Sequence, residues 1–142
     1  MTLFDAAAKL VAGSATEELR EAWIDGTLRF QHCDACGYVR YPPAPRCPQC
    51  LEPGGGWRED AGTGAVWSFC VYHHLYHPAF TGELPYGVAL VDLDSGPRLI
   101  SNLVDVDAGD VRIGMRLAAR VVEVKPGFPL VYFGPDSGGE RA

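Results

Sequence analysis

The sequence predicts a mainly β protein with N-terminal helices, a rubredoxin-like zinc ribbon and a five-stranded OB-fold barrel. Apolar residues recur at helical spacing in residues 1–27, two C-x2-C pairs lie within residues 28–58, and five strand-like segments occupy residues 59–134. Residues 135–142 are rich in glycine, serine and charge, and we expect a flexible tail there. With 142 residues, 47% of them hydrophobic, the chain can build one medium domain or two small ones.

Two short amphipathic helices are predicted before the ribbon. The first has apolar residues at i, i+3, i+4 and i+7 between Phe4 and Val11. A second begins at Ser14, which forms a capping-box pattern with Glu17, and Gly26 is placed to end it. Neither helix is long enough to be stable alone, so we expect each to pack on the rest of this chain or on another protein.

Two C-x2-C pairs separated by ten residues predict one tetrahedral metal site with the ligands Cys33, Cys36, Cys47 and Cys50. Four cysteine ligands close the coordination sphere and leave no position for water or substrate, so the metal is expected to be structural. The segment has few apolar residues, and metal binding must therefore supply its folding energy.

Zinc is the expected metal, at one ion per chain. Iron in the same cage, as in rubredoxin, also fits the spacing, and two disulfides are a third possibility. The N-terminus lacks the basic and apolar regions of an export signal, which disfavours disulfides and leads us to expect a cytoplasmic protein. Gly37 follows the first pair, as a metal knuckle needs, whereas Leu51 holds the matching place after the second.

Five strands are expected in the C-terminal half, within residues 64–72, 86–93, 98–104, 114–125 and 129–133. The connection between the first two is long, and a loop separates the third from the fourth. This order matches the small Greek-key barrel called the OB-fold. Cys70 lies in the first of these strands, and we expect a buried, inert thiol because no adjacent basic group is evident.

The long connection offers the candidate ligand contacts His73, His77, Phe80 and Tyr86. His73 and His74 are consecutive, so in a strand they point to opposite faces and are not expected to share a metal. The alternatives are solvent-exposed loop histidines and plain packing at the end of the barrel. We predict no catalytic residues, because no nucleophile–base set or phosphate-binding glycine loop stands out.

The net charge of −6 gives the chain no general attraction to nucleic acid, and its apolar runs are too short to span a membrane. Nucleic acid and membrane are therefore not expected as partners. Binding of single-stranded nucleic acid, a common use of OB-folds, remains the less favoured alternative.

The order of helices, four-cysteine ribbon and OB-like barrel is accompanied by several ordered motifs, which are Cys33-x2-Cys36-Gly37, Tyr41-Pro42-Pro43-x2-Arg46-Cys47-Pro48-x-Cys50, Gly62-x-Gly64-x-Val66-x-Ser68-Phe69, His77-Pro78-Ala79-Phe80, Pro85-Tyr86-x-Val88-Ala89-Leu90-Val91 and Val111-Arg112-Ile113-Gly114-Met115. Over nearly its whole length the chain resembles the zinc-ribbon/OB-fold family of acyl-CoA-associated proteins, long catalogued as domain of unknown function thirty-five.

The resemblance implies a non-catalytic accessory subunit of a thiolase-superfamily enzyme. Such partners include thiolase-like aldolases that cleave CoA-linked steroid or lipid side chains, where a MaoC-type hydratase also takes part. Acetoacetyl-CoA thiolases with hydroxymethylglutaryl-CoA synthases are the alternative. In this family the barrel is expected to help form the acyl-CoA site, while the ribbon and the helices dock on the partner. The steroid or lipid aldolase is the leading expectation for this chain.

Overall fold

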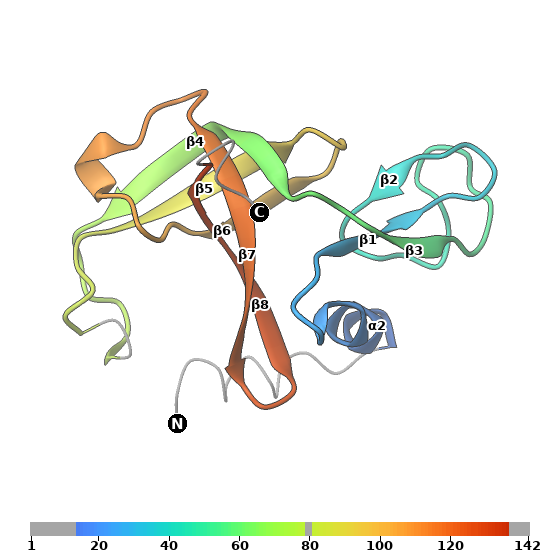
Figure 1. Cartoon of the computed structure of the whole chain (residues 1–142), viewed down its shortest axis with the longest axis horizontal. Coiled ribbons are helices and arrows are strands. Elements are labelled where there is room, and N and C mark those ends of the chain that lie inside the picture. The colour runs from blue at the N-terminus through green and yellow to red at the C-terminus, as the bar shows by residue number, and fades with distance from the viewer. Residues whose placement is uncertain (1–13, 79–80, 137–142) are drawn as a thin grey trace. The chain divides into compact units, whose positions relative to one another are not determined.

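The computed structural model describes residues 14–78 and 81–136. The predicted first helix and Phe80 lie outside these residues. The described residues form one α-helix, α2 (Ser14–Trp23), and two antiparallel sheets (Figure 1). No helix in the described part of the chain has the length and apolar character needed to cross a membrane.

The described residues divide into two compact units, a ribbon unit and a barrel unit. The ribbon unit holds the residues through Asp60 with Ser95–Pro97 and Val121–Leu130, and the barrel unit holds Ala61–Asp94, Arg98–Arg120 and the residues from Val131 on.

The ribbon unit is built on a three-stranded sheet in the order β2-β1-β3, formed by β1 (Arg29–His32), β2 (Val39–Arg40) and β3 (Gly56–Glu59). Helix α2 packs on this sheet through the buried Trp23. Its indole N–H donates to the Arg29 carbonyl at 2.8 Å, and its ring stacks on Tyr41 with centroids 6.1 Å apart. The fully buried Phe30 meets both rings edge-on, so three aromatic side chains pack together at the centre of this unit.

Strand β3 has no counterpart among the predicted strands. The sequence Gly54-Gly55-Gly56 is typical of a linker, yet Gly56 begins β3 and pairs with His32 of β1. Gly55 has a φ of +133°, and a Cβ there would stand 2.7 Å from the His32 carbonyl oxygen. Gly55 is therefore required for the close approach to β1, which local propensity does not reveal.

The barrel strands follow the order β6-β5-β4-β7-β8, as expected for an OB-fold. They are β4 (Thr63–Tyr72), β5 (Tyr86–Leu93), β6 (Arg98–Asn102), β7 (Arg116–Lys125) and β8 (Phe128–Pro135), with a short 3-10 helix η2 (Ala108–Asp110) before β7. Figure 1 shows β7 and β8 as one long hairpin. The sheet closes where the Val104 N–H donates to the Phe133 carbonyl at 2.9 Å, beside a parallel bridge from Leu103 to Phe133.

A β-bulge between Val66 and Ser68 sets which side chains of β4 face the core. Val66 is buried, and beyond the bulge Ser68 is paired with Leu90, on the outer face of β5. Cys70 follows Ser68 on that face and is exposed. The prediction of a buried thiol was therefore wrong, because a sequence read as unbroken alternation does not include the bulge.

Candidate metal centre

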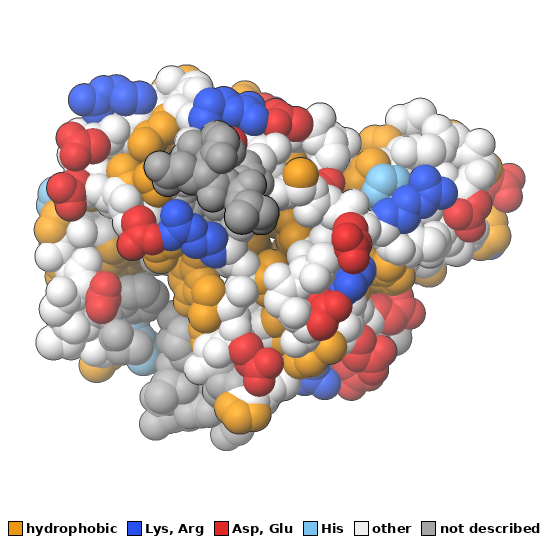
Figure 2. All heavy atoms as spheres, in the orientation of Figure 1, with side chains coloured by type: hydrophobic (Ala, Val, Ile, Leu, Met, Phe, Trp, Pro, Cys, Tyr) orange, Lys and Arg blue, Asp and Glu red, His pale blue; other side chains and the backbone are white. Residues whose placement is uncertain are grey.

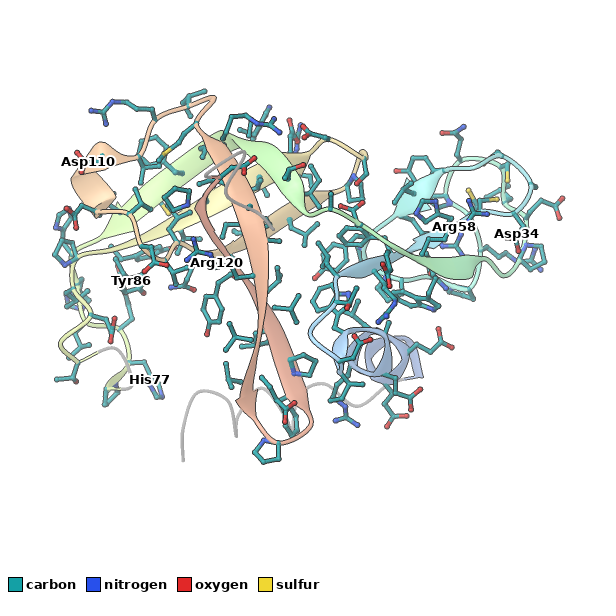
Figure 3. The ribbon with its side chains drawn as sticks, viewed as in Figure 1. Asp34, Arg58, His77, Tyr86, Asp110 and Arg120 are labelled. Atoms are coloured by element: carbon teal, nitrogen blue, oxygen red, sulfur yellow. The ribbon has the colours of Figure 1, made fainter. Side chains whose placement is uncertain are left out.

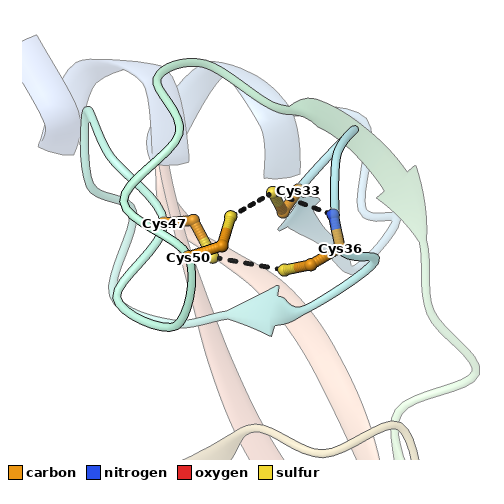
Figure 4. A group of neighbouring side chains, drawn as sticks. All are labelled: Cys33, Cys36, Cys47 and Cys50. Atoms are coloured by element: carbon orange, nitrogen blue, oxygen red, sulfur yellow. Dashed lines mark hydrogen bonds between the residues drawn. The ribbon is translucent and has the colours of Figure 1, made fainter.

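The four predicted ligands converge on one point at the end of the ribbon (Figure 4). Cys33 and Cys36 come from the turn between β1 and β2, and Cys47 and Cys50 come from the loop that precedes β3. Their sulfur atoms all lie within 4.8 Å of one another. Cys33 and Cys47 are buried, so the site is open to solvent mainly on the side of the other two cysteines.

The backbone of the first pair wraps around its leading sulfur. The Cys36 N–H lies 3.5 Å from the Cys33 sulfur and lowers the pKa of that thiol to about 6, with help from the Ala35 N–H and against the effect of burial. The turn closes with a 2.9 Å hydrogen bond from the Gly37 N–H to the Cys33 carbonyl. Backbone donors of this kind favour the thiolate, which is the form that binds a metal.

The second pair repeats the pattern. Burial raises the pKa of Cys47, but the N–H groups of Cys50 and Gln49 together with the Cys36 and Cys50 thiols outweigh it, and the net pKa is lowered. For Cys50 the Glu52 N–H lowers the pKa, yet burial and the neighbouring sulfurs prevail and raise it to about 12. Four sulfurs this close cannot all ionise without a positive charge between them, and a divalent cation supplies that charge.

The spacing of the sulfurs fits such a cation. The Cys33 and Cys50 sulfurs are 3.5 Å apart, and the Cys36 and Cys47 sulfurs are 3.6 Å apart. A tetrahedral cage with metal–sulfur bonds of about 2.3 Å has edges of about 3.8 Å. The separations are far longer than the roughly 2.0 Å of a disulfide, and all four cysteines are free. The four cysteines are thus positioned to bind one metal ion.

A buried arginine stabilises the loop that carries the second cysteine pair. Arg40 of β2 is 2% exposed, and its Nε donates to the Gln31 side-chain oxygen at 3.0 Å. Its Nη2 donates to the carbonyls of Ala44, at 2.9 Å, and Gly54. The same Gln31 oxygen accepts the Ala44 N–H at 2.9 Å. Gln31 and Arg40 therefore connect β1 and β2 to the chain on both sides of the second cysteine pair, a role that no sequence pattern marked.

The candidate ligand contacts of the barrel unit lie around the β4–β5 connection (Figure 3). Tyr86 begins β5 and stacks on Tyr72 with ring centroids 5.0 Å apart, and Tyr76 meets Tyr72 edge-on at 6.1 Å. His73 is exposed and His77 is half-buried. Tyr72 and Tyr76 were not among the predicted site residues, and nothing in the sequence beyond their aromatic character marks them.

Comparison with known proteins follows the same two-part division. Residues 20–54 match the model of the ChsH2 rubredoxin-like zinc ribbon domain, and residues 57–122 match that of the ChsH2 C-terminal OB-fold domain. A solved structure described as the Ltp2-ChsH2(DUF35) aldolase is 40% identical in sequence, with a TM-score of 0.79. The match covers 88% of this chain and 97% of that one.

Three curated relatives extend the comparison. A probable enoyl-CoA hydratase alpha subunit of Thermomonospora curvata is 44% identical over 81% of this chain. The 3-oxo-4,17-pregnadiene-20-carboxyl-CoA hydratase alpha subunit of Mycobacterium tuberculosis is 34% identical over 77% of it. The chain spans only 35% and 34% of these two proteins. A DUF35 domain-containing scaffold protein of Methanocaldococcus jannaschii is 32% identical over 66% of each chain.

The two domain models together cover both the metal centre and most of the barrel, and the similar solved structure matches over nearly its full length. The chain therefore belongs to the DUF35 family, with the zinc ribbon and OB-fold domains of the ChsH2 type.

Proposed function

We propose that this chain is a non-catalytic accessory subunit that binds and stabilises a thiolase-superfamily enzyme and helps to form its acyl-CoA site. The observation that carries the proposal is the similarity to the DUF35 part of an aldolase complex, over 88% of this chain. The closed set of four sulfurs agrees with it, because such a site holds a loop together and offers no position to a substrate.

Within that class, an aldolase acting on CoA-linked steroid or lipid side chains is the leading candidate. The name of the solved complex supports an aldolase, and the name of the M. tuberculosis relative supports a steroid-derived acyl-CoA. Two relatives are named as hydratase alpha subunits, so a MaoC-type hydratase is a further proposed partner. We propose that the complex works in the cytoplasm.

Zinc is the proposed metal, with iron as the alternative. Zinc, when bound, supplies a fixed charge that holds the four thiolates of Cys33, Cys36, Cys47 and Cys50 together. The protein's own part is to aim its backbone N–H groups at the sulfurs and to hold the loop of the second cysteine pair in place through Arg40. The metal centre therefore gives the ribbon a fixed shape with which to dock.

The β4–β5 connection is the proposed acyl-CoA contact, through His73, His77, Phe80 and Tyr86. The stacked Tyr72 and Tyr86 rings support it, because they offer a rigid apolar wall. Such a wall suits the pantetheine arm or the acyl chain of the substrate, and the two histidines add polar groups beside it.

Co-expression tests the proposal. The partner is the thiolase-like protein encoded beside this chain, or Ltp2 of the similar complex if none is encoded there. The two proteins should elute together in gel filtration, and acyl-CoA cleavage should require both. The isolated chain should turn over no acyl-CoA. A partner that is fully soluble and active alone, or robust turnover by this chain alone, contradicts the proposal.

An accessory subunit of a biosynthetic thiolase with hydroxymethylglutaryl-CoA synthase is the second candidate, and the relative named as a scaffold protein agrees with a role in holding enzymes together. The products separate the two candidates, since an aldolase releases a shortened carbonyl compound and a thiolase transfers an acyl group between CoA thioesters.

Binding of single-stranded nucleic acid has less support. On the face shown in Figure 2, basic side chains lie apart among acidic ones and form no continuous stripe.

A further inference from the structure

We propose that the outer face of β4, β5 and β6 is a docking surface for an apolar, uncharged patch of the thiolase-superfamily partner. This face, called here the Trp67 face, consists of Trp67, Ser68, Cys70, Val88, Leu90, Asp92, Arg98, Ile100 and Asn102. The inference rests on the proposed function for the identity of the partner, and on the following geometry for the site.

Strand register puts these side chains on one side of the sheet. Along β5 every second residue is buried and the others are half-exposed, so the two faces of this strand are cleanly separated. Residues paired across antiparallel strands share a face, and Leu90 pairs with Ser68 on one side and Ile100 on the other. Val88 pairs in the same way with Cys70 and Asn102. Three neighbouring strands therefore contribute to one surface.

The surface is apolar and open to solvent. Ile100 is 69% exposed and Trp67 is 51% exposed, although both are large hydrophobic residues. Cys70 is also exposed, and the Tyr72–Tyr86 stack bounds the face at the end near the β4–β5 connection. Contiguous exposed apolar surface costs solvation free energy in a free monomer, and it is a common mark of a protein–protein contact.

The charges on the Trp67 face are paired with each other. Arg98 contacts both carboxylate oxygens of Asp92, one of them at 3.2 Å, and its guanidinium lies 4.1 Å from the centroid of the Trp67 ring. The remaining members of the face are uncharged. A complementary partner surface must therefore be uncharged as well, and the association should depend little on ionic strength.

The same charge pattern argues against nucleic acid as the occupant. OB-folds commonly bind oligonucleotides on the face of their second and third strands, which are β5 and β6 here. That use needs free basic groups for the phosphates, whereas Arg98 is occupied by Asp92 and the chain carries a net charge of −6. Tryptophan, tyrosine and arginine are also the residues most enriched where proteins bind each other tightly. These observations favour a protein partner.

The test compares Ile100→Lys with a matched variant, Ile113→Lys. Both positions are exposed isoleucines of the barrel unit, and both variants add the same charge, but Ile113 lies outside the Trp67 face. Ile100→Lys should weaken binding of the thiolase-like partner by about 30-fold or more, as expected for a central contact, and Ile113→Lys by less than about 3-fold. Ile100→Ser, which adds no charge, should weaken it by about 10-fold. Thermal unfolding of each variant checks that the barrel is intact.

The outcomes separate this inference from the proposed function. If the wild-type chain does not bind the partner, the proposed function fails. If it binds and Ile100→Lys binds equally well, the proposed function stands and the Trp67 face is not the docking surface. A wild-type affinity that falls more than about 10-fold between 0.05 and 0.5 M salt contradicts an uncharged contact. If the free chain dimerises and Ile100→Lys abolishes the dimer, the occupant is a second copy of the chain and the proposal is overturned. If the chain retains a labelled single-stranded oligonucleotide, the occupant is nucleic acid and the proposal is overturned as well.

Discussion

At the scale of single residues, Leu51 is the unusual member of the metal centre. Its φ is 68°, close to the 77° of Gly37, and its N–H donates to the Cys47 carbonyl at 2.9 Å, as the Gly37 N–H does to Cys33. The two knuckles therefore have the same backbone conformation, but only one has a glycine. Left-handed backbone costs a residue with a Cβ about 1–2 kcal/mol. The Leu51 side chain is 68% exposed, so its burial within the described chain offsets little of this conformational cost.

Leu51→Gly should stabilise the metal-bound ribbon by about 0.5–1 kcal/mol, because relief of the left-handed strain exceeds the extra freedom that glycine has when unfolded. The free energy of unfolding, followed by tryptophan fluorescence in denaturant, measures the change. Leu51→Ala is the matched control, since it removes most of the side chain but keeps the Cβ and hence the strain. Equal effects of the two substitutions would sink this explanation.

At the scale of elements, the predictable strands are apolar, β-prone runs bounded by turn residues. The predicted segment 86–93 coincides with β5 because it is such a run, and Asp94-Ser95-Gly96 ends it. Strand β3 could not be predicted, since Gly56–Glu59 is a short segment that directly follows two glycines, and it is a strand only because it pairs with β1. The cysteine ligands follow from spacing, but the buried Arg40 beneath them does not, because its partners are carbonyl groups of distant residues.

Strand β4 packs so closely against β5 at Gly64 that no side chain fits there. A Cβ at this position would stand 2.2 Å from the Asp92 carbonyl oxygen and 2.9 Å from the Leu93 Cα, and both are backbone atoms that cannot rotate away. Gly64→Ala should therefore destabilise the barrel by about 1–3 kcal/mol, measured by calorimetric unfolding. Gly109→Ala in η2 is the control, because a Cβ there meets open space. The steric argument is wrong if both variants unfold at the wild-type temperature.

At the scale of the whole molecule, the two units are stabilised by different means. The barrel unit buries an apolar core whose members include Val66, Val91, Leu99, Leu117 and Phe133. The ribbon unit buries fewer apolar side chains, chiefly Trp23, Leu28 and Phe30, together with two of the cysteines. A core of that size does not offset the conformational entropy of so many residues, so we expect the ribbon to need a bound metal ion for its stability and the barrel not to need one.

Removal of the metal should therefore unfold the ribbon and leave the barrel core folded. A strong chelator with a thiol reductant is added to variants that keep one tryptophan each, Trp23 in the ribbon unit or Trp67 in the barrel unit. The emission of Trp23, which is 4% exposed, should shift to longer wavelength, because its stacking on Tyr41 is lost. The emission of Trp67 and the strand signal of the barrel should change little. Cys36→Ser should reproduce the chelated state and bind less than the one metal ion per chain expected for the wild type. If Trp23 stays buried in the metal-free protein, the ribbon does not depend on the metal. If the barrel unfolds together with the ribbon, the two units are not stabilised separately.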